Sequence, residues 1–127
     1  MNIPEDLLYS KEHEWVRIDG SKAQVGITDY AQHSLGDIVF VELPEVDSEV
    51  EAMSEAGIVE SVKAVSPIYS PVSGKIIAVN EKLESTPELL NKTPYEEWIF
   101  EVEITNTEEQ KDLLDGAAYK KFCELQK

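Results

Sequence analysis

Closely spaced glycine and proline residues divide the chain into short apolar segments, and this spacing restricts its fold more than any other feature. Apolar residues 15–18 and 23–27 flank Asp19-Gly20, a dipeptide suited to positive φ, so we expect a β-hairpin there. Residues 37–43 form another strand-like segment, which runs into Pro44, a residue that cannot continue a central strand. Short strands at such spacing favour a compact antiparallel sandwich or barrel. The remaining strand-like segments are residues 57–61, 65–69, 75–80 and 98–104.

The last of these segments shows the clearest alternation between apolar and mostly polar side chains. A period of two is typical of a strand with one face against a core. We therefore expect one buried face made of Trp98, Phe100, Val102 and Ile104.

Three further segments carry helix signals. Thr28 is a suitable N-cap for a short helix that Gly36 ends, and the threonine and proline at the start of residues 86–90 predict a second one. Residues 107–110 match a capping box, so we expect a C-terminal helix packed on the sheet. Glycine inside a helix costs about 1 kcal/mol relative to alanine, so a division of this helix at Gly116 is an alternative. The apolar stripe of the helix consists of Leu113, Leu114, Ala117, Ala118, Phe122 and Leu125.

Length and charge exclude several classes of protein. The 127 residues fit one domain, with a core of about residues 5–105 and a helical segment of about residues 107–125. The apolar runs are only strand-sized and no signal or transit peptide is visible, so we expect a protein without a membrane span that is cytoplasmic, or organellar and already processed. The net charge of −15 disfavours nucleic acids and anionic membranes as partners, and it favours a monomer that docks on basic surfaces.

The common motifs of enzymes are absent from the sequence. It contains no phosphate-binding Gly-x-x-x-x-Gly-Lys loop, no Gly-x-Ser-x-Gly elbow and no His-Glu-x-x-His pair. On a strand, His13 would point away from both neighbouring glutamates, so we expect it on the surface rather than in a metal site. Cys123 is the only cysteine and is expected to pack in the C-terminal helix. The residues thus indicate neither a metal site nor a catalytic triad, and none of these motifs points to an enzyme.

Lys63 stands out because of its position between the strand-like segments 57–61 and 65–69. Such a tip can enter the active site of another protein, and an amide on the lysine amine removes its charge and lengthens a flexible side chain. From physical reasoning alone, a solvated turn residue is the commoner explanation of a lysine in this setting.

Five blocks of the sequence resemble the glycine cleavage H-protein family, in the family's order and over about residues 5–125. A single short motif would be only moderately specific, but five blocks in order are hard to reach by chance. The blocks are residues 9–15, 26–32, 35–44, 60–64 and 68–74, and the fourth reads Glu60-Ser61-Val62-Lys63-Ala64.

The resemblance implies a mainly β fold, a barrel-sandwich hybrid of two small antiparallel sheets with short peripheral helices and a C-terminal helix. It also implies that lipoate is attached to Lys63 as an amide, and that a lipoylating enzyme recognises Glu60, Ser61, Val62 and Ala64.

The function that the resemblance implies is that of a shuttle. Members of the family carry an aminomethyl group from a pyridoxal-phosphate glycine decarboxylase (P protein) to a tetrahydrofolate-dependent aminomethyltransferase (T protein), and electrons to dihydrolipoamide dehydrogenase (L protein). By the same resemblance, His33 lies near the cleft that shelters the loaded arm, and a partly exposed histidine at a helix end is the alternative.

Two departures from the family pattern leave alternatives open. Asp47 stands where the family usually has glycine, although aspartate tolerates a left-handed backbone better than most residues. Glutamates 96 and 97 replace a glycine-containing turn, which leaves open a divergent H-like protein that serves lipoate transfer. A biotin carrier domain is the rival of another class, but its lysine is normally flanked by methionines, whereas Val62 and Ala64 stand here.

Overall fold

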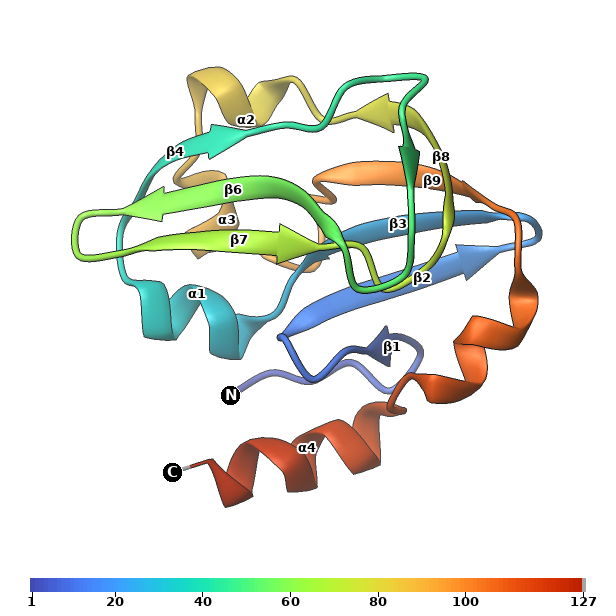
Figure 1. Cartoon of the computed structure of the whole chain (residues 1–127). Coiled ribbons are helices and arrows are strands. Elements are labelled where there is room, and N and C mark those ends of the chain that lie inside the picture. Colours follow the sequence, from blue (N-terminus) through green and yellow to red (C-terminus); the bar gives the residue numbers. More distant parts are fainter. Residues whose placement is uncertain (127) are drawn as a thin grey trace.

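The computed structural model describes residues 1–126, which form two antiparallel sheets with short helices around them (Figure 1). One sheet has six strands in the order β1-β2-β3-β9-β8-β5, and the other has three in the order β4-β6-β7. This arrangement confirms the expected mainly β architecture. The strands are β1 (Leu8–Tyr9), β2 (Glu14–Asp19), β3 (Lys22–Ile27), β4 (Ile38–Glu42), β5 (Glu49–Val50), β6 (Glu55–Ser61), β7 (Val65–Tyr69), β8 (Gly74–Val79) and β9 (Phe100–Ile104).

The helices that lie between strands are short, and one of them differs from its prediction. In α1 (Asp29–Leu35), the Thr28 hydroxyl accepts a hydrogen bond from the Ala31 amide, which confirms Thr28 as the N-cap. In place of a helix over residues 86–90, the chain forms α2 (Lys82–Ser85) and α3 (Leu89–Lys92). Thr86 closes α2 instead of beginning a helix, because its amide donates to the Lys82 carbonyl.

The C-terminal segment is divided into a 3-10 helix, η1 (Thr107–Asp112), and a helix, α4 (Gly116–Leu125). The alternative of two pieces is therefore correct. The division follows from a two-way backbone bridge between Tyr9 and Leu114, with both N–O distances 2.7 Å. Asp115 then caps α4, and the Gly116 backbone lies close enough to Glu5 that a Cβ at Gly116 would be 3.2 Å from the Glu5 Cα atom.

The main apolar core lies between the two sheets, and a second cluster joins β1 and β2 to α4. Phe100, Val102 and Ile104 are buried in the main core, as the alternation predicted. Trp98 is the exception, since it packs against the second cluster while Ile99 enters the main core. The reason is that β9 begins only at Phe100, so the alternation of a strand does not extend back to Trp98. The second cluster consists of Leu7, Tyr9, Trp15, Tyr95, Tyr119 and Cys123, and it confirms the packing role expected for Cys123.

Among residues 1–126, no helix is long and apolar enough to cross a membrane.

Candidate functional site

The β6–β7 hairpin ends in a tight turn of residues 61–64, which carries Lys63 and extends beyond the strand ends of the smaller sheet (Figure 1). The Ser61 amide donates to the Ala64 carbonyl at 2.8 Å. In the other direction, the Ser61 hydroxyl oxygen accepts from the amides of Lys63 and Ala64 at 3.3 and 3.1 Å. Serine side chains often close turns in this way. Ser61 therefore has a structural role in shaping the tip, in addition to the recognition role that the resemblance implies.

The tip is also attached to the connection between α1 and β4. The Val62 amide donates to the Asp37 carbonyl at 3.0 Å. Gly36 has φ +78° and ψ −156°, a backbone conformation that is essentially restricted to glycine. A Cβ atom at Gly36 would lie 3.5 Å from Cε of Lys63, so the lysine side chain passes directly over this glycine.

The side-chain amide of Asn91, in α3, holds the same connection from the other side. Its nitrogen donates to the Gly36 carbonyl at 2.8 Å and to Gln32 at 3.0 Å, and its oxygen accepts from the Ile38 amide at 2.9 Å. Every hydrogen-bonding group of this amide except one acceptor lone pair is thus engaged. The Lys63 tip is therefore supported by a hydrogen-bonded path that starts in α3.

The amine of Lys63 is exposed and accessible. Three ion pairs form among residues 1–126, and Lys63 takes part in none of them. An exposed amine without a paired carboxylate is free to accept an acyl group, so the residues present fit a covalently attached lipoyl group.

The other residues of the predicted site are placed around this tip. Val62 and Ala64 are exposed, and Glu60 is half-buried in β6, where it pairs with Phe40 on one side and Val65 on the other. His33 is exposed in the last turn of α1 and makes no side-chain hydrogen bond with any residue from 1 to 126. Its place in an arm cleft stays a prediction.

Sequence reasoning missed a buried carboxylate, Glu14, at the start of β2. Its two oxygens accept from the Ser10 hydroxyl at 2.5 Å and from the Tyr69 amide at 3.2 Å. The side chain is only 2% exposed, and burial raises the pKa of Glu14 to about 8. No local pattern in the sequence indicates that Glu14, Trp15 and Val16 are all buried in succession.

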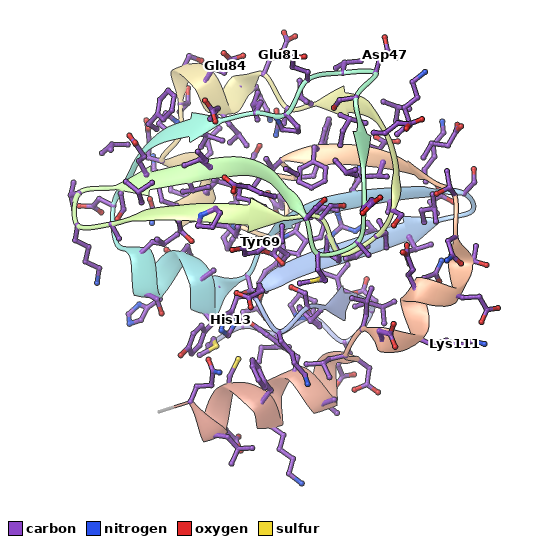
Figure 2. All side chains as sticks on the ribbon, in the orientation of Figure 1. His13, Asp47, Tyr69, Glu81, Glu84 and Lys111 are labelled. Atoms are coloured by element: carbon purple, nitrogen blue, oxygen red, sulfur yellow. The ribbon has the colours of Figure 1, made fainter. Side chains whose placement is uncertain are left out.

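The expectation that His13 lies free on the surface is wrong. His13 is half-buried: its ring stacks on Tyr30 with a centroid distance of 4.3 Å, and its Nδ1 atom lies 2.7 Å from the Tyr119 hydroxyl. With φ of +68°, His13 forms the turn before β2 rather than part of the strand, so strand alternation does not apply to it. Figure 2 shows His13 between the sheets and α4, the helix that carries Tyr119.

Both departures from the family pattern are accommodated. Asp47 has φ of +74°, as its tolerance of a left-handed backbone suggested, and its carboxylate lies 3.4 Å from the Lys75 amine. Glu97 is buried and receives a hydrogen bond from Asn80 and an ion pair from Lys82, both at 3.1 Å. Glu97 is therefore integrated into the fold, whereas Glu96 beside it is exposed.

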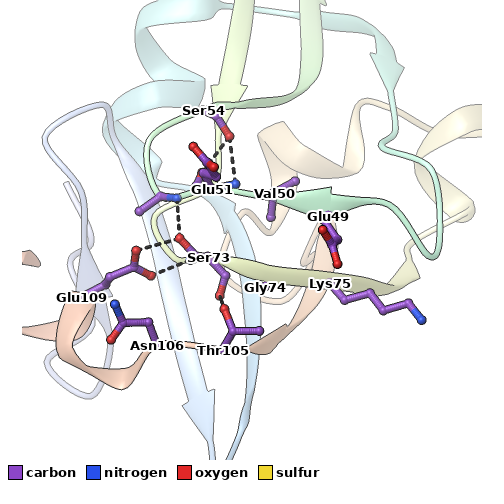
Figure 3. Close-up of a pocket in the computed structure, with 11 residues that line it drawn as sticks. Glu49, Val50, Glu51, Ser54, Ser73, Gly74, Lys75, Thr105, Asn106 and Glu109 are labelled. Carbon is purple, nitrogen blue, oxygen red and sulfur yellow. Dashed lines mark hydrogen bonds between the residues drawn. The ribbon is translucent and has the colours of Figure 1, made fainter.

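An open hollow of about 910 Å³ lies between β5, β8 and η1 and shares no residue with the tip (Figure 3). Its polar groups bind one another: Glu109 accepts from both the amide and the hydroxyl of Ser73, at 2.7 and 2.6 Å, and the Ser73 hydroxyl accepts from Ala52. These internal bonds explain the structure of the hollow without a ligand.

The protein has a small β fold of two sheets, and an accessible lysine lies at a hairpin tip whose backbone is held by hydrogen bonds. These features are typical of carrier proteins whose cofactor is attached to a lysine. The sequence profile described as Glycine cleavage H-protein matches residues 7–126 of this chain. The chain belongs to that family, whose members are non-catalytic lipoyl carriers.

Individual relatives agree with the family match. Glycine cleavage system H proteins of Syntrophomonas wolfei and Alkaliphilus oremlandii are 54% and 57% identical over 124 residues, covering 98% of this chain and 95% and 98% of the relatives. The crystal structure of a glycine cleavage system H protein from Mycobacterium marinum has a TM-score of 0.85 and 36% identity, with 98% of each chain covered. These matches confirm the resemblance seen in the five sequence blocks.

Proposed function

We propose that Lys63 carries a lipoyl group in amide linkage and that the chain is the shuttle of a glycine cleavage system. The observation that carries the proposal is an exposed amine that forms no ion pair with residues 1–126, on a hairpin tip whose backbone is held by Ser61 and Asp37. The motif around Lys63 and the family membership support it.

The partners follow from this proposal. A lipoyl group held by Lys63 would supply a dithiolane, whose sulfurs can bind an aminomethyl unit and carry electrons. The proposed partners are therefore a pyridoxal-phosphate glycine decarboxylase, a tetrahydrofolate-dependent aminomethyltransferase and dihydrolipoamide dehydrogenase. The chain's own residues present the arm and catalyse none of these reactions. We further propose that the chain works in the cytoplasm as a monomer.

Attachment of the group requires the Lys63 amine in its uncharged form. Its nitrogen forms a bond to the acyl carbon of an activated lipoyl donor, the bond between that carbon and the donor breaks, and the amine releases a proton. Ser61 positions the turn in which this happens, because its hydroxyl oxygen accepts from the Lys63 amide. Glu60, Val62 and Ala64 supply side chains beside the amine that a lipoylating enzyme can recognise.

Replacement of the lysine tests the proposal directly. In Lys63→Arg the positive charge is kept, but a guanidinium with a pKa above about 12 stays protonated and is a poor nucleophile. We expect the native protein to carry the mass of one lipoyl group and the variant to carry none and to support no glycine cleavage. Substitutions at exposed tips usually change stability by less than about 0.5 kcal/mol, so both proteins should melt alike.

Two results would contradict the proposal. A biotin-sized mass on the native protein would assign the chain to the biotin carriers instead. A lipoyl mass on the Lys63→Arg variant, or full turnover with it, would show that the arm is attached elsewhere.

A further inference from the structure

Large apolar side chains gather in the open around the Lys63 tip. Of the exposed large hydrophobic residues between residues 1 and 126, four lie on β4 or the β6–β7 hairpin close to the tip. We name this set the tip patch: Val39, Phe40, Val62 and Val65, with exposed fractions of 54, 47, 70 and 65%. Contiguous exposed apolar surface is a common mark of a protein interaction site.

A bulge in β4 creates half of this patch. The register of β4 against β6 shifts between Ile38, which pairs with Ser61, and Phe40, which pairs with Glu60. Without the shift, alternation would direct Phe40 to the same face as Ile38, which is buried in the core. With it, Ile38 and Val41 are both buried and the two residues between them are both exposed. The bulge thus directs a phenylalanine to solvent, at the expense of apolar burial that stabilises the fold.

The sheet register then places Phe40 in line with the hairpin. Phe40 pairs with Glu60, and Glu60 pairs with Val65, so these three side chains form one row on the outer face of the smaller sheet. Val62 and Lys63 follow at the end of the same hairpin. The row is therefore continuous with the lysine.

Apart from Lys63 itself, the charged side chains of β4 and of the β6–β7 hairpin are all acidic. Between Ala23 and Gly74, Lys63 is the only lysine or arginine, whereas the same stretch holds nine aspartates and glutamates. Glu42 and Asp37 are exposed at the two ends of β4, and Glu60 lies within the row. A protein that fits this surface has an apolar centre with lysine or arginine at its rim.

We propose that the tip patch is the docking surface of the enzyme that attaches the lipoyl group, and that this enzyme presents an apolar, basic-rimmed entrance. The inference rests on the proposed function. An enzyme that acylates Lys63 must bring its reacting carbon to bonding distance of the lysine amine, so its entrance must cover the residues beside that amine. Enzymes that act on the distal end of the acylated arm have a longer reach and are not required to touch these side chains.

Lipoylation kinetics of the full-length chain, freed of lipoate, test the proposal. The probe is a lipoate–protein ligase supplied with lipoate and ATP, and the product is followed by intact mass. For Phe40→Ser and Val65→Ser we expect at least a tenfold loss of kcat/KM, carried by KM. Val46→Ser is the matched control: Val46 is 48% exposed but lies outside the tip patch, so its kcat/KM should stay within twofold of the unsubstituted chain.

Each remaining outcome has a defined meaning. If the unsubstituted chain gains no lipoyl mass, the proposed function fails. If it is lipoylated and both patch variants keep its KM, only the docking surface is refuted. If the substitutions lower only turnover with the decarboxylase, the patch binds a downstream enzyme instead. If they change only the oligomeric state, the patch binds a second copy of the chain. Either result overturns the proposal. A variant with an unchanged melting temperature and a raised KM has lost docking. A variant with a lowered melting temperature and a lowered kcat has a damaged fold.

Discussion

At the scale of single residues, Glu14 has the strongest physical consequence. Burial raises its pKa from 4.5 to about 8, so the folded state binds a proton that the unfolded state has already released near neutral pH. The associated stability is fully present below about pH 4.5 and is lost as the pH rises through about 8. The two hydrogen bonds from Ser10 and Tyr69 lower the pKa, but they do not offset the loss of solvation.

We therefore expect Glu14→Gln to change the pH dependence of stability. Relative to the unsubstituted chain, the variant should gain stability as the pH rises from about 4.5 to about 8 and should show no further gain above that, because the difference in bound protons exists only between the two pKa values. Urea unfolding at several pH values measures the difference. Glu55→Gln, at an exposed position, is the control, and parallel pH profiles for Glu14→Gln and the unsubstituted chain would contradict the expectation.

The residues whose conformation was predicted correctly depend on local chemistry, whereas the residues whose burial was missed depend on distant contacts. Asp47 at positive φ and Thr28 as a cap follow from backbone chemistry that acts within a few residues. The burial of Glu14 and His13 depends on Tyr69, Tyr119 and Tyr30, which are distant in the sequence, so local patterns carry no signal for it.

At the scale of elements, α3 supports the lysine tip although it contains no residue of the tip. Asn91→Ala removes three hydrogen bonds and leaves the Gly36 carbonyl and the Ile38 amide without this partner. We expect a loss of about 1–3 kcal/mol in the free energy of unfolding, and faster hydrogen exchange at the Val62 amide, which binds the adjacent Asp37 carbonyl.

A second asparagine provides the control for this prediction. Asn80 is buried, whereas Asn91 is half-buried, and the side-chain nitrogen of Asn80 donates to Glu97 and to the Trp98 carbonyl, away from the tip. Asn80→Ala should destabilise the chain by a similar amount and leave exchange at Val62 unchanged relative to global stability. Equal effects of both substitutions at Val62 would refute a specific support of the tip by α3.

The sequence pattern predicted some of the helices and strands but not all of them. The first hairpin, the alternation over residues 100–104 and the hairpin that carries Lys63 were predictable, because strand pairing and turn residues are encoded locally. α2 and α3 were not, because each is a single turn stabilised by one buried leucine, Leu83 or Leu90, rather than by an amphipathic repeat. The tip was predicted, but its attachment to Gly36 and Asn91 joins segments that no motif connects.

At the scale of the whole molecule, the net charge of −15 predicts that docking depends on salt. Screening shortens the range of charge attraction to about 8 Å at physiological ionic strength. The KM of the glycine decarboxylase for the lipoylated chain should therefore rise between low and moderate ionic strength. Free lipoamide, which is uncharged, is the control substrate, and a KM for the chain as flat as that for lipoamide would exclude long-range steering.

The pinned hairpin tip has an energetic consequence for any partner that closes on it. Because Ser61, Asp37 and Gly36 already fix the backbone of the turn, association immobilises only the torsions of side chains and orders no loop. Preorganisation of this kind removes a large part of the entropic cost of binding. A partner can then recognise the tip selectively through a small contact area.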